Sequence, residues 1–306
     1  MIGERIKRIE DPALLRGVAR FADDIHLPSL AEAAFLRSPH PHASINAIEV
    51  EDARRAPGVH AVLTLNDLVP TLTSERMPLG FRDKTLPDGI TPFVLAKNEV
   101  RHVGEPVALV VAETRYLAED AAARIDVDYR TLPSVADCRA AIAPDAPQVH
   151  SDKPSNVLIE FEQDYGEADR VFADARHVFS LKLKQHRGGA HPLEGRAVVA
   201  RYEPIDDRLT VWSSTQMSHE LRSVLVKLLD SDERRIRVVA PEVGGGFGAK
   251  YLTYAEEVAV TAAARILERP IKWIEDRREH FTSSIQERDQ YWDVEVATDG
   301  DGKLLA

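Results

Sequence analysis

The feature that most constrains the fold is a glycine-rich stretch, residues 243–250 (VGGGFGAK), which lies between an apolar segment and an alanine-rich one. Residues 236–240 predict a short strand, and residues 254–267, which stop before Pro270, predict a helix. Glycines at such a junction allow positive φ angles and let a ligand approach the backbone closely. The unpaired N–H groups that open a helix attract anions. The chain therefore contains a strand–loop–helix unit whose loop either packs a helix on a sheet or binds a ligand.

Neither of the two common glycine motifs matches this loop. A Walker P-loop ends in Gly-Lys followed by Ser or Thr, whereas here Ala249 precedes Lys250 and Tyr251 follows it. The dinucleotide fingerprint also fails, because Val243 and Tyr251 stand where it requires glycine. Local sequence alone leaves both interpretations open, a packing turn and a ligand loop.

Composition restricts the class of protein and its partners. With 306 residues and 44% hydrophobic content, we expect about two domains with a substantial core. A formal net charge of −11 argues against a nucleic-acid-binding surface and against an anionic-membrane surface. The single cysteine, Cys138, excludes a disulfide within the chain and an iron–sulfur cluster held by four of its own cysteines, and we expect an inert thiol. The sequence shows neither an apolar signal core nor an apolar run that could span a membrane, so we expect a cytoplasmic protein.

Alternating strand and helix patterns place the chain in the α/β (α+β) class. Residues 1–40 are densely charged and interrupted by Pro12 and Gly17, which predicts an extended arm rather than a helix. Strands are expected near residues 33–39, 43–50, 59–65, 106–112 and 125–129, helices near 50–56 and 115–124, and an irregular loop over 70–92. We expect an arm and first domain over residues 1–142, a proline-punctuated linker over 143–155, and a second domain over 156–306.

Two successive strand–loop–helix units organise the second domain. The strand over residues 209–212 leads into a polar loop that holds Gln216, and the helix after it carries an apolar stripe. The stripe consists of Leu221, Val224, Leu225, Leu228 and Leu229. The glycine loop follows the next strand at the equivalent place, and residues 270–274 predict a further strand. If the first two strands are parallel, Gln216 and the glycine loop emerge at the carboxyl edge of one sheet, where α/β proteins usually bind ligands.

The last residues predict a hairpin. Residues 291–298 alternate like a strand, residues 299–302 (DGDG) are a strong turn signal, and residues 303–306 begin a return strand. Because a four-residue return leaves much of the hairpin backbone unpaired, we expect a separate polypeptide to complete this sheet.

Six segments carry a resemblance to a known family. They are residues 8–17 (RIEDPALLRG), 103–108 (VGEPVA), 214–216 (STQ), 236–241 (IRVVAP), 244–250 (GGGFGAK) and 269–277 (RPIKWIEDR). In this order they resemble the molybdopterin-binding subunit of the xanthine dehydrogenase, aldehyde oxidase and carbon monoxide dehydrogenase family. The resemblance implies an N-terminal hammerhead domain followed by the first, incomplete part of a molybdopterin-binding domain.

The resemblance also implies a cofactor and its contacts. The cofactor is molybdenum–molybdopterin, in bacteria commonly molybdopterin cytosine dinucleotide. Gln216 resembles the side chain that hydrogen-bonds an oxo ligand of the metal, a role that suits a neutral amide because it donates without ligating. The loop that lies against the cofactor corresponds to Gly245, Gly246, Phe247 and Gly248, whose N–H groups can stabilise charge without adding any. Gln216 and Phe247, whose ring would face the substrate, are the expected catalytic residues, and no protein side chain is expected to ligate the metal.

The implied function is that of a part-subunit in a hetero-oligomeric molybdenum hydroxylase. It would support oxidative hydroxylation of an aldehyde or N-heterocycle, with water as the oxygen source. Tyr251 stands where xanthine-oxidising relatives carry a glutamate, which argues against xanthine. The family's subunit is more than twice as long, so we expect the general-base glutamate outside this chain, on a complementing C-terminal molybdopterin-binding subunit. Iron–sulfur and FAD subunits are the other implied partners. The alternative is a non-catalytic module that binds molybdopterin or a partner.

Other polar residues are weaker candidates. His186, His191 and Glu194 match no zinc-site spacing, and we expect them to be structural or to influence the site only indirectly. Glu256 and Glu257 are expected on a solvated helix face.

Overall fold

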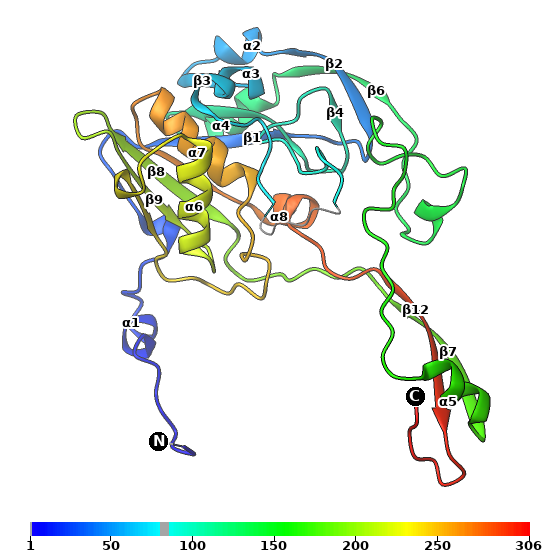
Figure 1. Cartoon of the computed structure of the whole chain (residues 1–306). Coiled ribbons are helices and arrows are strands. Elements are labelled where there is room, and N and C mark those ends of the chain that lie inside the picture. Colours follow the sequence, from blue (N-terminus) through cyan, green and yellow to red (C-terminus); the bar gives the residue numbers. More distant parts are fainter. Residues whose placement is uncertain (1, 80–85) are drawn as a thin grey trace. The chain divides into compact units, whose positions relative to one another are not determined.

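The computed structural model describes residues 2–79 and 86–306, which form two compact units (Figure 1). The larger unit contains the described residues before 80 together with Thr91–Leu132 and Ala190–Ser284. The smaller unit contains residues 86–90, Pro133–Gly189 and Ile285–Ala306. Each unit thus combines segments that are distant in the sequence, and the domain bounds expected above stay a prediction. Within the described ranges, no helix is long and apolar enough to cross a membrane.

A mixed seven-stranded sheet is the framework of the larger unit, in the order β10-β9-β8-β11-β1-β5-β3. Its strands are β1 (Ala31–Arg37), β3 (Val59–Leu63), β5 (Pro106–Ala112), β8 (Ala197–Glu203), β9 (Arg208–Ser213), β10 (Ile236–Val239) and β11 (Ile271–Ile274). Two neighbouring pairs are parallel, β1 with β11 and β9 with β10, and the others are antiparallel. Every residue of β5 is buried, as its continuous apolar run predicts.

Helices pack on this sheet by their apolar faces. In the larger unit, the helices after β1 are α2 (Glu51–Arg54), α3 (Leu65–Leu68), α4 (Arg115–Ala122), α6 (Ser218–Leu228), α7 (Ala255–Ile266) and α8 (Arg277–Ser283). The helix α6 packs against β10 and buries its predicted leucine and valine stripe, and α4 packs against β1 and β5. The helix α7 packs against β8, β9 and β11.

A three-stranded sheet completes the larger unit, in the order β4-β2-β6. Its strands are β2 (Ala43–Glu49), β4 (Glu99–Val100) and β6 (Asp126–Thr131), of which β2 and β6 lie where the sequence predicts them. The loop expected over residues 70–92 starts within the short 3-10 helix η2 (Val69–Thr71), and its residues 80–85 lie outside the described ranges.

The N-terminal arm departs from the expectation that it lacks helix. A short helix, α1 (Asp11–Leu15), forms there, followed by the 3-10 turn η1 (Ala22–Asp24). Pro12 lies in the first turn of α1, where a missing N–H removes no intrahelical hydrogen bond. The charge pattern therefore gave the wrong prediction for these five residues.

The smaller unit is built on a two-stranded sheet of β7 (His177–Gln185) and β12 (Gln290–Thr298). The helix α5 (Ala168–Asp174) directly precedes β7 in the chain. The predicted turn after β12 is present, since the N–H of Asp299 donates to the carbonyl of Lys303 at 3.1 Å. The return residues form an isolated bridge from Leu304 to Thr298, and the N–H of Leu305 donates to the carbonyl of Ala297 at 2.9 Å. The backbone of β12 pairs instead with β7, a strand that the sequence reading missed although Phe179, Leu181 and Leu183 alternate along it. The prediction of a largely unpaired hairpin was therefore wrong for the edge of β12 that pairs with β7.

Candidate functional site

Two parallel strands carry the expected site residues to one edge of the sheet. The strands β9 and β10 are paired from Leu209 with Ile236 to Trp212 with Val239. The loop with Gln216 follows the carboxyl end of β9, and the glycine loop follows that of β10. The parallel arrangement on which the sequence argument depended is thus confirmed.

A hydrogen bond joins the Gln216 side chain to the glycine loop. The N–H of Gly248 donates to Oε1 of Gln216 at 3.0 Å. An N–H donor requires the amide oxygen at that position, so the other arm of the Gln216 amide is its NH₂ group. This NH₂ group has no acceptor in the described part of the chain, and the residue is exposed. The contact therefore orients a free amide donor at the sheet edge.

Further donors lie in the same loop. The N–H groups of Gly245, Gly246 and Phe247 have no acceptor among the residues that the structure describes, whereas that of Gly244 is bound by Glu194. Consecutive free N–H groups in a loop bind anions and polarised oxygens. Together with the Gln216 amide, they form a cluster of donors without a charged side chain.

Each loop residue has its own steric constraint. A Cβ at Gly246 would lie 2.5 Å from Cδ of Gln216, so the absence of a side chain keeps room for that amide. Gly245 and Gly248 have φ angles of +101° and +89°, which favour glycine. Phe247 also has a positive φ, +52°, and its side chain is 76% exposed. The loop thus presents an aromatic ring to its surroundings at some cost in backbone strain.

Lys250, the last residue of the glycine-rich stretch, forms an ion pair with Glu194. Glu194 Oε2 accepts from Lys250 Nζ at 2.7 Å and from the N–H of Gly244 at 2.7 Å. The N–H of Gln216 donates to the carbonyl of Lys250 at 2.8 Å. Burial lowers the pKa of Lys250, and the Glu194 carboxylate opposes that effect. The sequence predicted a structural or indirect role for Glu194, but no role was predicted for Lys250.

The expectation of a solvated face for Glu256 and Glu257 was wrong. These side chains are on α7, and the two residues are only 2% and 7% exposed. Glu256 pairs with Arg196 at 3.1 Å and Arg37 at 2.9 Å. Burial alone raises the pKa of Glu256, but these guanidinium groups together lower it to about 2.

Glu257 has the opposite electrostatic environment. Burial raises its pKa to about 7, although the hydroxyl of Ser213 donates to Oε1 at 2.5 Å and the N–H of Tyr254 donates to Oε2 at 2.9 Å. A sequence signal for this burial exists, because α7 is apolar all round between residues 258 and 264 except for Thr261, and such helices are buried. A carboxylate on a buried helix needs a partner, and Arg196 is that partner for Glu256.

The histidine candidates do not come together as a metal site. His186 belongs to the smaller unit and His191 to the larger one. The ring of His191 packs edge-on against His280 with centroids 5.3 Å apart. In the described ranges, no group of three His, Cys, Asp or Glu side chains is arranged to hold a metal ion. Cys138 is exposed, and its Sγ donates to the carbonyl of Asp289 at 2.9 Å.

The comparison with known families bears on both parts of the chain. Residues 149–306 match the family model described as molybdopterin cofactor-binding domain. Residues 16–133 match the model described as aldehyde oxidase and xanthine dehydrogenase, a/b hammerhead domain. This chain belongs to the molybdopterin-binding large-subunit family of xanthine dehydrogenase and carbon monoxide dehydrogenase. The resemblance drawn from the sequence and the fold class are confirmed.

Individual members of the xanthine dehydrogenase family match the chain over nearly its whole length. The nicotine 6-hydroxylase large subunit of Paenarthrobacter nicotinovorans is 37% identical and is matched over 99% of this chain and 37% of the relative. The carbon monoxide dehydrogenase large chain of Afipia carboxidovorans is 36% identical over 100% of this chain and 38% of the relative. The crystal structure of quinoline 2-oxidoreductase from Pseudomonas putida 86 has a TM-score of 0.90 at 35% identity, over 99% of this chain and 38% of that one. The chain thus spans less than two fifths of the length of these relatives.

The loop geometry fits the cofactor of the xanthine dehydrogenase family. A cofactor whose metal is already held by its own pterin needs hydrogen-bond donors from the protein rather than ligating side chains. The amide of Gln216 and the free N–H groups of Gly245, Gly246 and Phe247 are such donors. The Cβ-free backbone at Gly246 leaves room for the amide.

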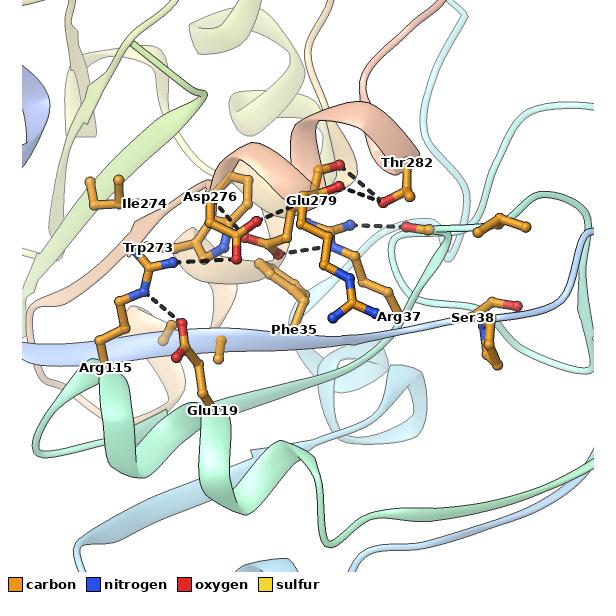
Figure 2. Close-up of a pocket in the computed structure, with 16 residues that line it drawn as sticks. Phe35, Arg37, Ser38, Arg115, Glu119, Trp273, Ile274, Asp276, Glu279 and Thr282 are labelled. Atoms are coloured by element: carbon orange, nitrogen blue, oxygen red, sulfur yellow. Dashed lines mark hydrogen bonds and ion pairs between the residues drawn. The ribbon is translucent and has the colours of Figure 1, made fainter. Parts of the chain in front are cut away.

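A hollow of about 310 Å³ lies elsewhere in the larger unit, between β1, α4 and α8 (Figure 2). Its walls include Phe35 and Trp273. Its charged groups are largely paired with one another, as Figure 2 shows for Arg37 with Glu279 at 2.8 Å and Arg115 with Glu119 at 2.7 Å. None of the expected site residues lines it, so we assign the candidate site to the loops at the sheet edge.

Proposed function

We propose that this chain is the part of a molybdenum hydroxylase subunit that binds molybdenum–molybdopterin and supports oxidative hydroxylation of an aldehyde or N-heterocycle. The observation that carries the proposal is the 3.0 Å hydrogen bond from Gly248 to Gln216. It sets a free amide beside the free N–H groups of the glycine loop, on a chain that belongs to the molybdopterin-binding family.

The residues of the loops have distinct proposed roles. Bound molybdenum–molybdopterin, which we propose carries a cytosine dinucleotide, supplies the two-electron oxidation of a C–H bond with oxygen derived from water. The NH₂ group of Gln216 donates a hydrogen bond toward the cofactor, and Gly248 holds that amide in place. The N–H groups of Gly245, Gly246 and Phe247 stabilise negative charge that develops during the reaction. The exposed Phe247 ring forms an apolar wall beside the substrate, and the general-base glutamate comes from outside these residues.

We also propose the partners of this part-subunit. The relatives include proteins named as a large subunit, a large chain and a subunit gamma of a complex, which supports a hetero-oligomer. The proposed partners are a complementing C-terminal molybdopterin-binding polypeptide, an iron–sulfur subunit and an FAD subunit, assembled in the cytoplasm. Tyr251 in place of the glutamate of xanthine-oxidising relatives directs the proposal away from xanthine.

Analysis of the complex purified from its native host tests this function. Molybdenum is measured by mass spectrometry, the nucleotide released by acid is identified by chromatography, and dye reduction is measured with aldehydes and N-heterocycles. We expect molybdenum and a cytosine nucleotide in comparable amounts, together with turnover of one of these substrate classes. Molybdopterin without turnover would instead support a non-catalytic binding module. A complex without pterin would exclude the hydroxylase and leave only a module that binds a partner.

A further inference from the structure

The ion pair between Glu194 and Lys250 connects the two ends of the glycine loop. One oxygen, Oε2 of Glu194, accepts both from the N–H of Gly244 at the start of the loop and from Nζ of Lys250 at its end, each at 2.7 Å. The N–H of Glu194 also donates to the carbonyl of Gly244 at 3.3 Å. The two ends of the loop are therefore fixed to one carboxylate.

The same pair reaches the Gln216 loop. The carbonyl of Lys250 accepts from the N–H of Gln216 at 2.8 Å and from the hydroxyl of Thr215 at 3.4 Å. A displacement of Lys250 would consequently move the backbone of Gln216 relative to the glycine loop. The contact between Gln216 and Gly248 depends on that relative position.

The two charges depend on each other because they are shielded from water. The side chain of Lys250 is 1% exposed and that of Glu194 is 17% exposed, and Oε1 of Glu194 is buried without a hydrogen-bond partner. Removing one member of a buried pair leaves an uncompensated charge, whereas replacing both members by neutral groups of similar shape is often tolerated. Burial lowers the pKa of Lys250 and so disfavours the charged ammonium, whereas the hydrogen-bonded Glu194 carboxylate favours it.

We propose that Glu194 and Lys250 are positioning residues that form a clasp, which holds Gly244 and Gln216 in fixed relative position for the cofactor. The part of this statement that concerns the cofactor rests on the proposed function. The part that concerns the loops rests on the contacts above alone.

Hydrogen–deuterium exchange on the purified complex tests the clasp directly. Glu194→Gln keeps the shape and the acceptor for Gly244 but leaves Lys250 without a counter-charge, and Lys250→Met removes the charge at similar length. We expect each single variant to raise exchange at the amides of Gly244 and Gln216 by about tenfold or more, with α7 unchanged. The double variant should exchange more slowly than either single variant, because no buried charge is left unpaired. Glu233→Gln, on an exposed pair with Arg222, is the matched control and should match the wild type.

The outcome decides between a clasp and a merely packed pair. Wild-type exchange in both single variants, equal loosening of α7, or additive effects in the double variant would each overturn the proposal. Molybdenum content, measured on the same samples, should fall in the single variants and recover in the double variant. Loosened loops with undiminished molybdenum would overturn the positioning role toward the cofactor. If the wild-type complex contains no molybdenum but the exchange pattern is as expected, the proposed function fails while the clasp stands.

Discussion

Gln216 and Gly248 are 32 residues apart in the sequence, and the N–H of Gly248 donates to Oε1 of Gln216 at 3.0 Å. Because the glycine loop takes up the amide oxygen, the NH₂ group is left as the donor that faces outward. The side chain of a polar loop residue is thus oriented by the backbone of a second loop. The function proposed for Gln216 depends on this orientation.

Replacing Gln216 by alanine should slow turnover without releasing the cofactor. The variant loses one preorganised donor, and the loss of such a donor costs about 3 kcal/mol of barrier, roughly a hundredfold in rate. Molybdenum content and steady-state turnover of the purified complex measure the two effects separately. His219→Ala, at an exposed position in the first turn of α6, is the control. Full turnover with intact cofactor would contradict the role of Gln216.

Gly246→Ala should imitate the loss of Gln216. The new Cβ would lie 2.5 Å from Cδ of Gln216 and must displace that side chain. We expect a similar fall in turnover, and little additional loss when Gly246→Ala is combined with Gln216→Ala. Kinetics of the single and double variants give this comparison, and independent, multiplicative losses would count against it.

Gly248→Ala should act through the backbone instead. A Cβ at Gly248 meets no atom within 4 Å, but φ is +89°, a conformation that costs a residue with a side chain about 1 kcal/mol or more. Urea unfolding should therefore show lower stability, while the Gln216 amide keeps its place as long as the loop holds. A variant as stable as the wild type would refute this explanation.

Phe247→Ala should change substrate preference more than stability. The ring is 76% exposed, so its removal leaves no cavity in the core. If it forms one wall of the substrate site, its loss should shift the ratio of kcat/KM between aromatic N-heterocycles and small aldehydes by about tenfold. Tyr116→Ala, 78% exposed on α4 and outside the glycine loop, is the control for loss of an exposed aromatic ring. An unchanged ratio would place the substrate elsewhere.

Glu257→Gln should remove a pH dependence of stability. Burial raises the pKa of Glu257 from 4.5 to about 7, so the folded chain binds this proton more tightly than the unfolded chain does. The resulting stability is complete below pH 4.5 and is lost as the pH rises through 7, a change of about 3 kcal/mol. The glutamine can accept from the N–H of Tyr254 and donate to Ser213, as the protonated acid can. The free energy of unfolding of the variant, relative to that of the wild type, should therefore be higher at pH 8 than at pH 5.

Urea unfolding of both proteins at these two pH values measures the difference. Glu233→Gln, whose side chain in the wild type is 69% exposed, provides the background for a change from Glu to Gln. A difference between Glu257→Gln and wild type that stays constant from pH 5 to pH 8 would show that Glu257 does not titrate in this range.

Local pattern determined the elements that carry the candidate site. The apolar runs before Gln216 and Gly244 predicted two strands, and the parallel pairing of β9 and β10 brings their loops to one edge. The leucine stripe predicted the buried face of α6. These features depend on periodicity and on glycine, which act within a few residues of each other, and a sequence displays both directly.

Only the tertiary structure decided the environment of the charges. Arg196 lies 60 residues from Glu256 in the sequence, and Lys250 lies 56 residues from Glu194. The pairing of β12 with β7 likewise joins segments more than 100 residues apart, from His177 with Thr298 to Gln185 with Gln290. Whether a carboxylate is solvated or buried depends on a partner that compensates for the loss of its hydration, and no local sequence pattern identifies that partner. The prediction of a solvated face for Glu256 and Glu257 was therefore wrong. Only chain folding brings Arg196 to Glu256 and Ser213 to Glu257.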